Sequence, residues 1–185
     1  MPFVNWWKIN SPVIVTVHDV ETMSSPPKKI LTLSSLTRVL QKLRRQGTKI
    51  AFTNGCFDIL HFGHVSYLQE AAKGKNRVLV VAINSDESVR TIKGEGRPIV
   101  PQKERAALIA ALACVDYVTI FNEPTPLKVI ETLKPDVLIK GADWKGKEVA
   151  GADFVKSHGG RLEFIKYIAG FSTTQLIESI KEKCF

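Results

Sequence analysis

The fold is decided by the stretch Thr53-Asn54-Gly55-Cys56-Phe57-Asp58-Ile59-Leu60-His61-Phe62-Gly63-His64. Before it, residues 50–52 read as a short apolar strand. After it, apolar residues recur with helical spacing, so a helix is expected to begin near His64. A helix start offers free backbone N–H groups and a partial positive charge, which favour phosphate. Two imidazoles beside it can donate to phosphate oxygens, and the glycines let the backbone approach a ligand closely. The stretch therefore predicts a strand-to-helix turn that binds a nucleotide.

The apolar pattern of the whole chain predicts an α/β fold. Strands are expected at 49–53, 78–83, 116–121, 136–140 and 161–166. Helices are expected at 64–73, 102–113, 126–133, 149–158 and 173–183, with an earlier helix closed by Gly47. Such alternation is typical of a Rossmann-like, doubly wound parallel sheet, here five-stranded with helices on both faces. Ligands of these sheets bind beyond the carboxyl ends of the strands, where the quoted stretch lies.

The two histidines also allow a metal site, because paired histidines often bind zinc. No other group of Asp, Glu, Cys or His in the sequence completes a recognisable set of ligands. The remaining histidines, His18 and His158, lie in unrelated contexts. A phosphate contact is therefore preferred to a metal site for His61 and His64.

Composition restricts the class of protein. With 185 residues and 44% apolar residues, the chain suits one soluble domain with a full core, and no apolar run is long enough to span a bilayer. Three cysteines without paired spacing favour a reducing, cytoplasmic location. The net charge of +8 could indicate nucleic acid, but the basic residues neither form a block nor alternate with aromatic residues. A small polyanionic substrate explains them better.

The segment from Gly55 to His64 resembles the HxGH signature of the cytidylyltransferase-like nucleotidyltransferases. Further motifs are similar to those of the adenylyltransferases of ADP-heptose synthesis: Asn84-Ser85-Asp86, Lys93-Gly94-Glu95-Gly96-Arg97-Pro98-Ile99, Lys140-Gly141-Ala142-Asp143-Trp144 and Gly170-Phe171-Ser172-Thr173-Thr174. The resemblance runs from about Lys29 to the C-terminus. It implies ATP and D-glycero-D-manno-heptose 1-phosphate as substrates, with Mg2+ carried by the triphosphate rather than by protein ligands.

The resemblance also implies roles for individual residues. His61, His64 and Lys93 are expected to be catalytic, and Lys93 and Arg97 to bind the substrate phosphate. The expected nucleotide-binding residues are Asn54, Gly55, Cys56, Phe57, Asp58, Gly63, Asn84, Asp86, Arg105, Lys140, Gly141, Asp143, Ser172, Thr173 and Thr174.

Several of these residues have a structural alternative. Asp58 can brace its own loop by accepting N–H bonds, and Cys56 is either a redox-sensitive thiol or a small residue that fits. Asp86 can serve only as the N-cap of a short helix over residues 88–92. Arg105 can form a surface ion pair with an acid one turn away.

The last motif has a local explanation as well. Ser172 can cap the final helix, with Gln175 reaching back and Phe171 packing on Leu176, as in a capping box with its hydrophobic staple. Both interpretations can hold, since Thr173 and Thr174 remain free to donate to phosphate.

The sequence divides into an extension at 1–27, expected to be irregular, and a nucleotidyltransferase domain at 28–185. Met23 could be the true start. No kinase domain precedes the signature, so a separate sugar kinase is expected to supply the sugar phosphate. A homodimer is expected from the superfamily.

The expected reaction needs two repelling polyanions to be aligned among fixed positive dipoles, which suits the abundance of Lys, Arg and His. One rival is a cytidylyltransferase that acts on a phosphorylated alcohol such as glycerol 3-phosphate. Another is a nucleotide-binding regulator without turnover. A synthetase-like RNA enzyme is disfavoured, because the chain is too short for a second signature loop and an anticodon-binding region.

Overall fold

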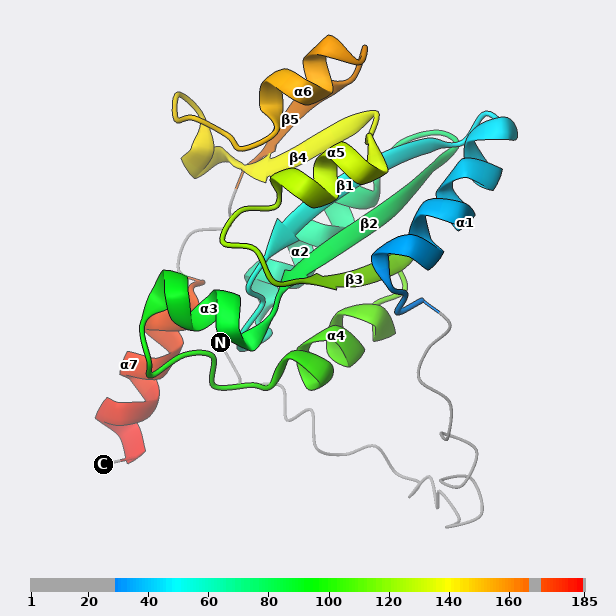
Figure 1. The fold of residues 1–185 in the computed structure, drawn as a ribbon. Helices are drawn as coiled ribbons and strands as arrows, with labels where there is room; N and C mark the ends of the chain where they lie inside the picture. Colours follow the sequence, from blue (N-terminus) through cyan, green and yellow to red (C-terminus); the bar gives the residue numbers. More distant parts are fainter. Residues whose placement is uncertain (1–28, 167–170, 185) are drawn as a thin grey trace, which may run out of the picture.

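The computed structural model describes residues 29–166 and 171–184, in which strands and helices alternate (Figure 1). The strands are β1 (Lys49–Gly55), β2 (Arg77–Asn84), β3 (Tyr117–Phe121), β4 (Val137–Gly141) and β5 (Arg161–Ile165). The helices are α1 (Leu33–Arg45), α2 (Phe62–Ala72), α3 (Asp86–Lys93), α4 (Gln102–Ala111), α5 (Leu127–Leu133), η2 (Ala142–Trp144), α6 (Ala152–Ser157) and α7 (Thr173–Cys184). The expected extension at 1–27, with Met23, lies outside the described residues, as does Gly170.

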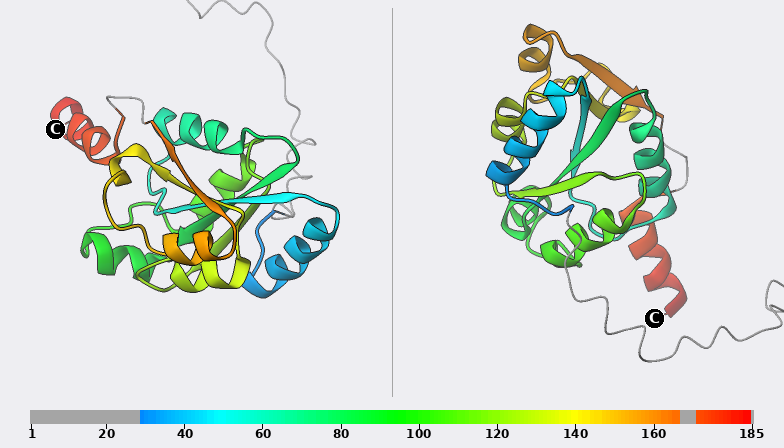
Figure 2. Two further views of the ribbon diagram at one scale, coloured as in Figure 1. Left: turned by 90° about the horizontal axis from the view of Figure 1, so that it is seen from above. Right: turned by 90° about the vertical axis from the view of Figure 1, so that its right-hand side faces the viewer.

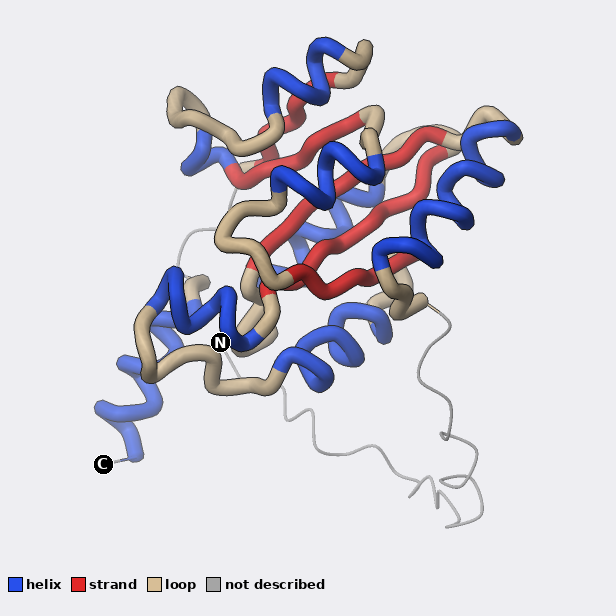
Figure 3. The backbone as a smooth tube through the Cα atoms, in the orientation of Figure 1, coloured by secondary structure: helices blue, strands red, loops and turns tan. Residues whose placement is uncertain are grey.

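The strands form one parallel sheet in the order β3-β2-β1-β4-β5, with β1 at its centre (Figure 3). The expected doubly wound, five-stranded Rossmann-like sheet is confirmed. From β1 the chain builds outward through β2 and β3, whereas β4 and β5 occupy the other side of β1. The strand order therefore reverses between β1 and β4, which is where such sheets bind ligands.

Apolar residues cover both faces of the sheet, because its strands are buried and alternate side chains point to opposite sides. On one face α2 and α4 pack on Ala51, Val81 and Ile139. On the other face α1, α5 and α6 pack on Phe52, Val80 and neighbouring strand residues. The two layers are visible in Figure 1, and the expectation of helices on both faces is confirmed.

The sheet opens at its carboxyl edge between the two central strands. In the described part of the chain, β1 and β4 pair only through Ala51 with Val137 and Phe52 with Leu138. By contrast, β1 stays paired with β2 as far as Gly55, and β4 stays paired with β5 as far as Gly141. The strand ends thus form two groups with an opening between them, at the point where the strand order reverses.

The expected strands and helices are all present, and the main differences lie at helix ends. The helix expected at 149–158 occupies only Ala152–Ser157, because Gly151 adopts the left-handed conformation with φ of 82° and cannot continue a helix. α7 projects away from the sheet (Figure 2), and none of its residues is buried among the described part of the chain. No helix within 29–166 or 171–184 is long and apolar enough to cross a membrane.

Candidate active site

His61 and His64 come together at the start of α2. Their rings stack with centroids 3.8 Å apart and an interplanar angle of 22°. His61 occupies the N-cap position of α2 but makes no side-chain cap bond, so the first amides of the helix are available to a ligand. The Nδ1 atoms of both rings are buried and have no hydrogen-bond partner among the described residues. An open helix start and two stacked imidazoles thus lie at one place, with both Nδ1 atoms buried.

The environment of the pair keeps both rings neutral at pH 7. Burial and, to a smaller extent, the neighbouring His61 lower the pKa of His64 to about 4, and a hydrogen bond with the backbone of Ile59 opposes the shift. Burial also lowers the pKa of His61. A neutral imidazole carries one N–H, so each ring can donate one hydrogen bond without repelling its neighbour.

A cavity of about 320 Å3 adjoins His61. It is lined by His61, Phe171, Ser172, Gln175, Leu176 and Ser179, so it lies between the start of α2 and the first turns of α7. Ser172 Oγ accepts from the amide of Gln175 at 3.1 Å, which confirms the expected cap of α7.

Phe171 packs on the start of α2, a contact that was not expected. Its ring meets the ring of Phe62 edge-on, with centroids 5.4 Å apart, and its Cβ lies close to Gly63. A Cβ built on Gly63 would stand 2.9 Å from Phe171 Cβ and 3.1 Å from the His61 ring. Gly63 thus allows α2 to pack closely against Phe171, two residues before α7 begins. Thr173 and Thr174 form the first turn of α7.

The turn after β1 is tightly built. Phe57 adopts a positive φ of 45°, which is rare for a residue with a bulky side chain. Its ring lies 5.2 Å from the ring of His64, and a Cβ on Gly55 would come within 3.0 Å of it. Burial raises the pKa of the Cys56 thiol, with smaller opposing effects from Lys93, Arg105 and Arg97. The thiol is therefore neutral at pH 7, which favours a small residue that fits over a reactive one.

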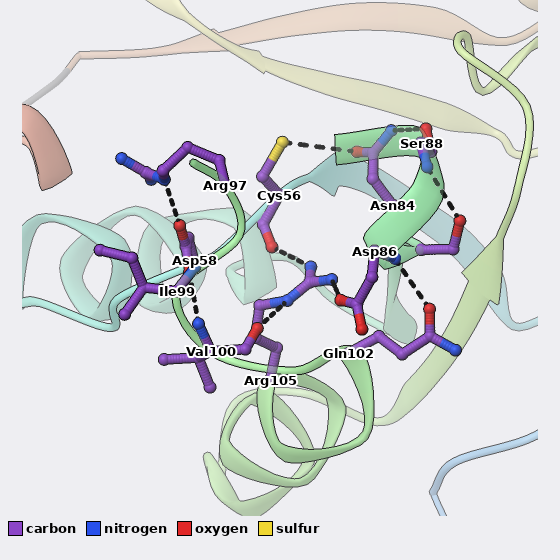
Figure 4. Close-up of polar contacts among 11 residues, drawn as sticks. Cys56, Asp58, Asn84, Asp86, Ser88, Arg97, Ile99, Val100, Gln102 and Arg105 are labelled. Atoms are coloured by element: carbon purple, nitrogen blue, oxygen red, sulfur yellow. Dashed lines mark hydrogen bonds and ion pairs between the residues drawn. The ribbon is translucent and has the colours of Figure 1, made fainter. Parts of the chain in front are cut away.

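Asp58 braces the site through a distant loop. Its side chain is 1% exposed and accepts from the amides of Ile99 and Val100 at 2.8 and 2.9 Å, and from Arg97 Nε (Figure 4). The bracing role is confirmed, but the partners belong to the loop before α4 rather than to its own turn. Because all these bonds are made to protein, Asp58 does not need a ligand to be satisfied.

Arg105 contradicts both expectations for it. The residue is 0% exposed, and its Nε, Nη1 and Nη2 donate to Val100 O, Cys56 O and Asp86 Oδ1 (Figure 4). The surface ion pair is therefore wrong, since the partner acid stands on α3 and the arginine is buried. With no exposed surface, Arg105 does not face a phosphate in this structure.

The N-cap of α3 is Ser85 rather than Asp86. Ser85 Oγ accepts from the amide of Ser88 at 3.2 Å, whereas the carboxylate of Asp86 pairs with Arg105. Asn84 is buried and donates to Ser88 Oγ at 2.9 Å, so it orders the start of α3. The expected capping role of Asp86 is wrong.

Lys140 stands at the opening of the sheet. Its Nζ donates to Asn54 Oδ1 across the gap between β4 and β1, and lies 5.2 Å from the centroid of the Trp144 ring. Burial lowers the pKa of Lys140 to about 8, and the charge of Asp143 opposes this effect. The ammonium has three donors, of which Asn54 uses one, so it can bind an anion in the opening. Gly141 follows at the end of β4.

Lys93 and Arg97 flank the loop after α3. Lys93 is exposed at the end of that helix, and Arg97 is half-buried against Asp58. Their positive charges lower the pKa of the Cys56 thiol, as that of Arg105 does, whereas the charge of Asp58 raises it; both effects are smaller than that of burial, which raises the pKa. The structure therefore brings the loop that carries Lys93 and Arg97 to the turn after β1. Within residues 29–166 and 171–184, neither cation contacts His61 or His64.

A larger cavity, of about 700 Å3, lies between α2 and β5. Three of its cations are already paired: Lys73 with Glu70, and Arg77 and Arg161 with Glu163. Because most of its charge has partners and the histidine pair is elsewhere, the smaller cavity is the better candidate for the active site.

Comparison with known proteins agrees with the geometry. The family model described as cytidylyltransferase-like matches residues 52–158, which hold the histidine pair, Arg105 and Lys140. The chain belongs to the cytidylyltransferase-like family. The expectation drawn from the HxGH signature is confirmed.

Relatives within this family can be named. The chain is 52% identical to the bifunctional protein HldE of Geobacter metallireducens over 157 residues, 85% of this chain and 32% of that protein. It is 51% identical to HldE of Helicobacter pylori over 156 residues, 84% of this chain and 32% of that protein. The chain thus spans about a third of the length of these curated relatives.

A solved structure is also similar. The lipopolysaccharide core biosynthesis protein of Thermoplasma volcanium superposes with a TM-score of 0.52 and 31% sequence identity, over 65% of this chain and 96% of that one.

Some residues of the site region carry no signal in the sequence. Gln102 Oε1 accepts from the amide of Asp86 at 2.8 Å, and Ser88 Oγ donates to Glu123 O at 2.9 Å. Trp144 stands over Lys140. Lys140 and Trp144 belong to one motif of the sequence, so their proximity could be expected. The contacts of Gln102 with Asp86 and of Ser88 with Glu123 join separate segments and could be recognised only from the fold.

Proposed function

We propose that this chain is an adenylyltransferase that joins ATP and D-glycero-D-manno-heptose 1-phosphate to give ADP-heptose and pyrophosphate. An oxygen of the sugar phosphate attacks the α-phosphorus of ATP. The bond from that phosphorus to the bridging oxygen breaks, and pyrophosphate leaves with the electron pair. The sugar phosphate is already ionised at pH 7, so the reaction needs no strong base.

The observation that carries this proposal is the stacked pair His61 and His64 at the open start of α2. Negative charge gathers on the phosphate oxygens and the leaving group in the transition state, and preorganised donors stabilise it best. The first amides of α2 are such donors, and the two imidazole rings lie beside them. They support a triphosphate seat beside the cavity that reaches α7.

Other cations support the alignment of two anions. Lys140 lies in the opening between β1 and β4, and Lys93 and Arg97 lie on the loop after α3. We propose that Lys93 and Arg97 bind the sugar phosphate and that Lys140 binds a phosphate deeper in the opening. Asn54, Gly141, Asp143, Thr173 and Thr174 would complete the nucleotide contacts. Holding both anions in line is the main part of the catalysis.

The donor set fits a metal carried by the nucleotide. Among residues 29–166 and 171–184 there is no group of three or more His, Cys, Asp or Glu that could hold an ion. The nearby carboxylates, Asp58 and Asp86, are engaged by Arg97 and Arg105. Mg2+ would therefore be held by oxygens of the triphosphate, whose charge it neutralises when bound.

The choice of ATP and heptose rests on the resemblance to the ADP-heptose adenylyltransferases and on the identity of about half the aligned residues to HldE. The Thermoplasma protein is named for lipopolysaccharide core biosynthesis, which agrees with this substrate. We further propose that a separate kinase reaction supplies the sugar 1-phosphate, and that residues 28–185 form the transferase domain.

The test is to measure pyrophosphate release by the pure protein. ATP with heptose 1-phosphate should be turned over, and CTP with glycerol 3-phosphate should not. Turnover of the cytidylyl pair instead would assign the alternative within the family. Nucleotide binding without any turnover would support a regulator and contradict the proposal.

We also propose a homodimer in solution. α7 has 12 residues and none is buried, although helices of this length are marginal in water without packing. Leu176, Ile177 and Ile180 share one side of it, and Ile180 is 45% exposed. Light scattering after size exclusion should give twice the chain mass, and a monomer would contradict the proposal.

A further inference from the structure

Arg105 is the largest fully buried side chain of the protein's described part. A buried guanidinium is costly to desolvate unless its charge is paired and its N–H groups are bonded. Here each nitrogen has an acceptor: Val100 O at 2.8 Å, Asp86 Oδ1 at 2.7 Å, and Cys56 O. To reach a phosphate, the side chain would have to leave all three acceptors and strand the carboxylate.

The three acceptors stand on three different segments of the site (Figure 4). Cys56 belongs to the turn between β1 and α2 that leads to the histidine pair. Asp86 opens α3, the helix that ends at Lys93, and Val100 belongs to the loop that carries Arg97. One side chain from α4 thus joins the nucleotide turn to both ends of the cationic segment.

Asp58 makes a second link between the same segments. From the turn after β1 it accepts from the amides of Ile99 and Val100 and from Arg97. Val100 is bonded through its amide to Asp58 and through its carbonyl to Arg105. The loop is therefore held through both peptide groups that flank Val100, which limits its freedom to shift relative to the turn.

We propose that Arg105 is a positioning residue for nucleotidyl transfer: from beneath the site it fixes the turn at Cys56 against the segment that carries Lys93 and Arg97. It touches neither substrate. Its effect is to set the distance between the triphosphate seat and the sugar-phosphate seat, on which in-line attack depends. The inference deepens the proposed function and rests on it for its kinetic part.

Two substitutions separate this role from phosphate binding. R105M removes the charge and the bonds, whereas R105K keeps the charge but supplies one ammonium for three separated acceptors. R77M and R77K are matched controls, because Arg77 is 6% exposed and donates to a carboxylate, Glu163, and to a carbonyl, Ala71 O, at the amino end of β2. The melting temperature of each variant is measured, so that the loss of stability in the Arg105 variants can be compared with that in the Arg77 controls.

In steady-state assays, both Arg105 variants should lose about 100-fold in kcat/KM, with KM raised for both substrates, because misplacement by about 1 Å costs that much. The Arg77 variants should lower the melting temperature without this kinetic loss. D86A should lose about tenfold and D86N less, since the asparagine oxygen still accepts from Arg105.

Hydrogen exchange provides a readout that is independent of turnover. In R105M and D86A, the peptide covering 94–101 should exchange faster, while β2 and β3 stay protected. If R105M does not fold, D86A and D58N carry the same test.

Near wild-type activity of R105K beside an inactive R105M would overturn the inference, because charge alone would then matter. Unchanged exchange of 94–101 in R105M or D86A would overturn it too. If the wild-type protein shows no adenylyl transfer, the proposed function fails. The hydrogen-exchange result still decides whether Arg105 fixes the turn at Cys56 against the loop at 94–101.

Discussion

The rings of His61 and His64 stack with centroids 3.8 Å apart, so a proton on one opposes a proton on the other. Burial, together with this repulsion, keeps the pair neutral, so it donates through N–H groups rather than through full charge. Bound phosphate would reverse this balance, because an anion favours the imidazolium form. The site is therefore poised to gain positive charge when the nucleotide arrives.

The first prediction concerns the pH dependence of stability without ligand. The pKa of His64 is about 4 in the folded protein and near 6.5 when unfolded, so the unfolded chain binds more protons between these values. Stability contributed by the neutral ring is complete above pH 6.5 and is lost as the pH falls toward 4. We expect a loss of up to about 2 kcal/mol between pH 7 and pH 5.

Urea unfolding at several pH values measures this loss. H64Q should flatten the slope between pH 7 and pH 5, whereas H158Q, at an exposed histidine, should keep it. An unchanged slope in H64Q would show that other groups cause the acid loss.

The second prediction concerns the rate of transfer. H61A and H64A should each lower kcat by about 100- to 1,000-fold, the effect of removing one preorganised donor from a developing charge. Circular dichroism should show an intact fold, because neither ring makes a side-chain hydrogen bond through its buried Nδ1 in the described part of the chain. Wild-type kcat in both variants would remove the histidines from the chemistry.

The third prediction concerns Lys140 and alkaline pH. With a pKa of about 8, its ammonium is charged below pH 8 and loses its charge as the pH rises through that value. KM for the substrate whose phosphate it binds should therefore rise above pH 8 in the wild-type protein. Comparing KM for ATP and for the sugar phosphate then shows which substrate Lys140 holds.

K140M should raise that KM at every pH and abolish the alkaline dependence, while K140R should move the dependence to higher pH. K147M, at an exposed lysine near the same loop, is the matched control and should behave as wild type. An alkaline rise that persists in K140M would assign the effect to another group.

The fourth prediction concerns the contact between α2 and α7. G63A should lower kcat/KM by about tenfold or more, because the added Cβ would stand 2.9 Å from Phe171 Cβ and 3.1 Å from the His61 ring. G96A is the control, since a Cβ there meets nothing within 4 Å. Equal activity in the two variants would show that the two helices can separate freely without cost to the site.

Much of the site could be read from the chain because its central elements are local. The strand, the turn and the helix start of residues 49–64 are consecutive, so their spacing alone places both histidines at one helix end. The alternation of apolar segments likewise predicted the parallel sheet and its ligand-binding edge. Capping of α7 by Ser172 was predictable for the same reason, since its partner is three residues away.

The errors concern side chains whose partners lie far along the chain. Arg105, for which a phosphate or a surface acid was expected, bonds to Cys56 across 49 residues. Asp58 was expected to brace its own turn and instead holds Ile99 and Val100, about 40 positions away.

The sequence by itself determined the elements, their parallel arrangement and the helix end at which both histidines lie. Only the tertiary structure decided that Arg105 is buried as a clamp, that Ser85 rather than Asp86 caps α3, and that Lys140 stands in the opening between β1 and β4. The physical reason is that local hydrogen bonds and periodic burial are encoded by neighbouring residues. Pairing between distant charges depends on the order of the strands and on which polar side chains become buried when the helices pack on the sheet.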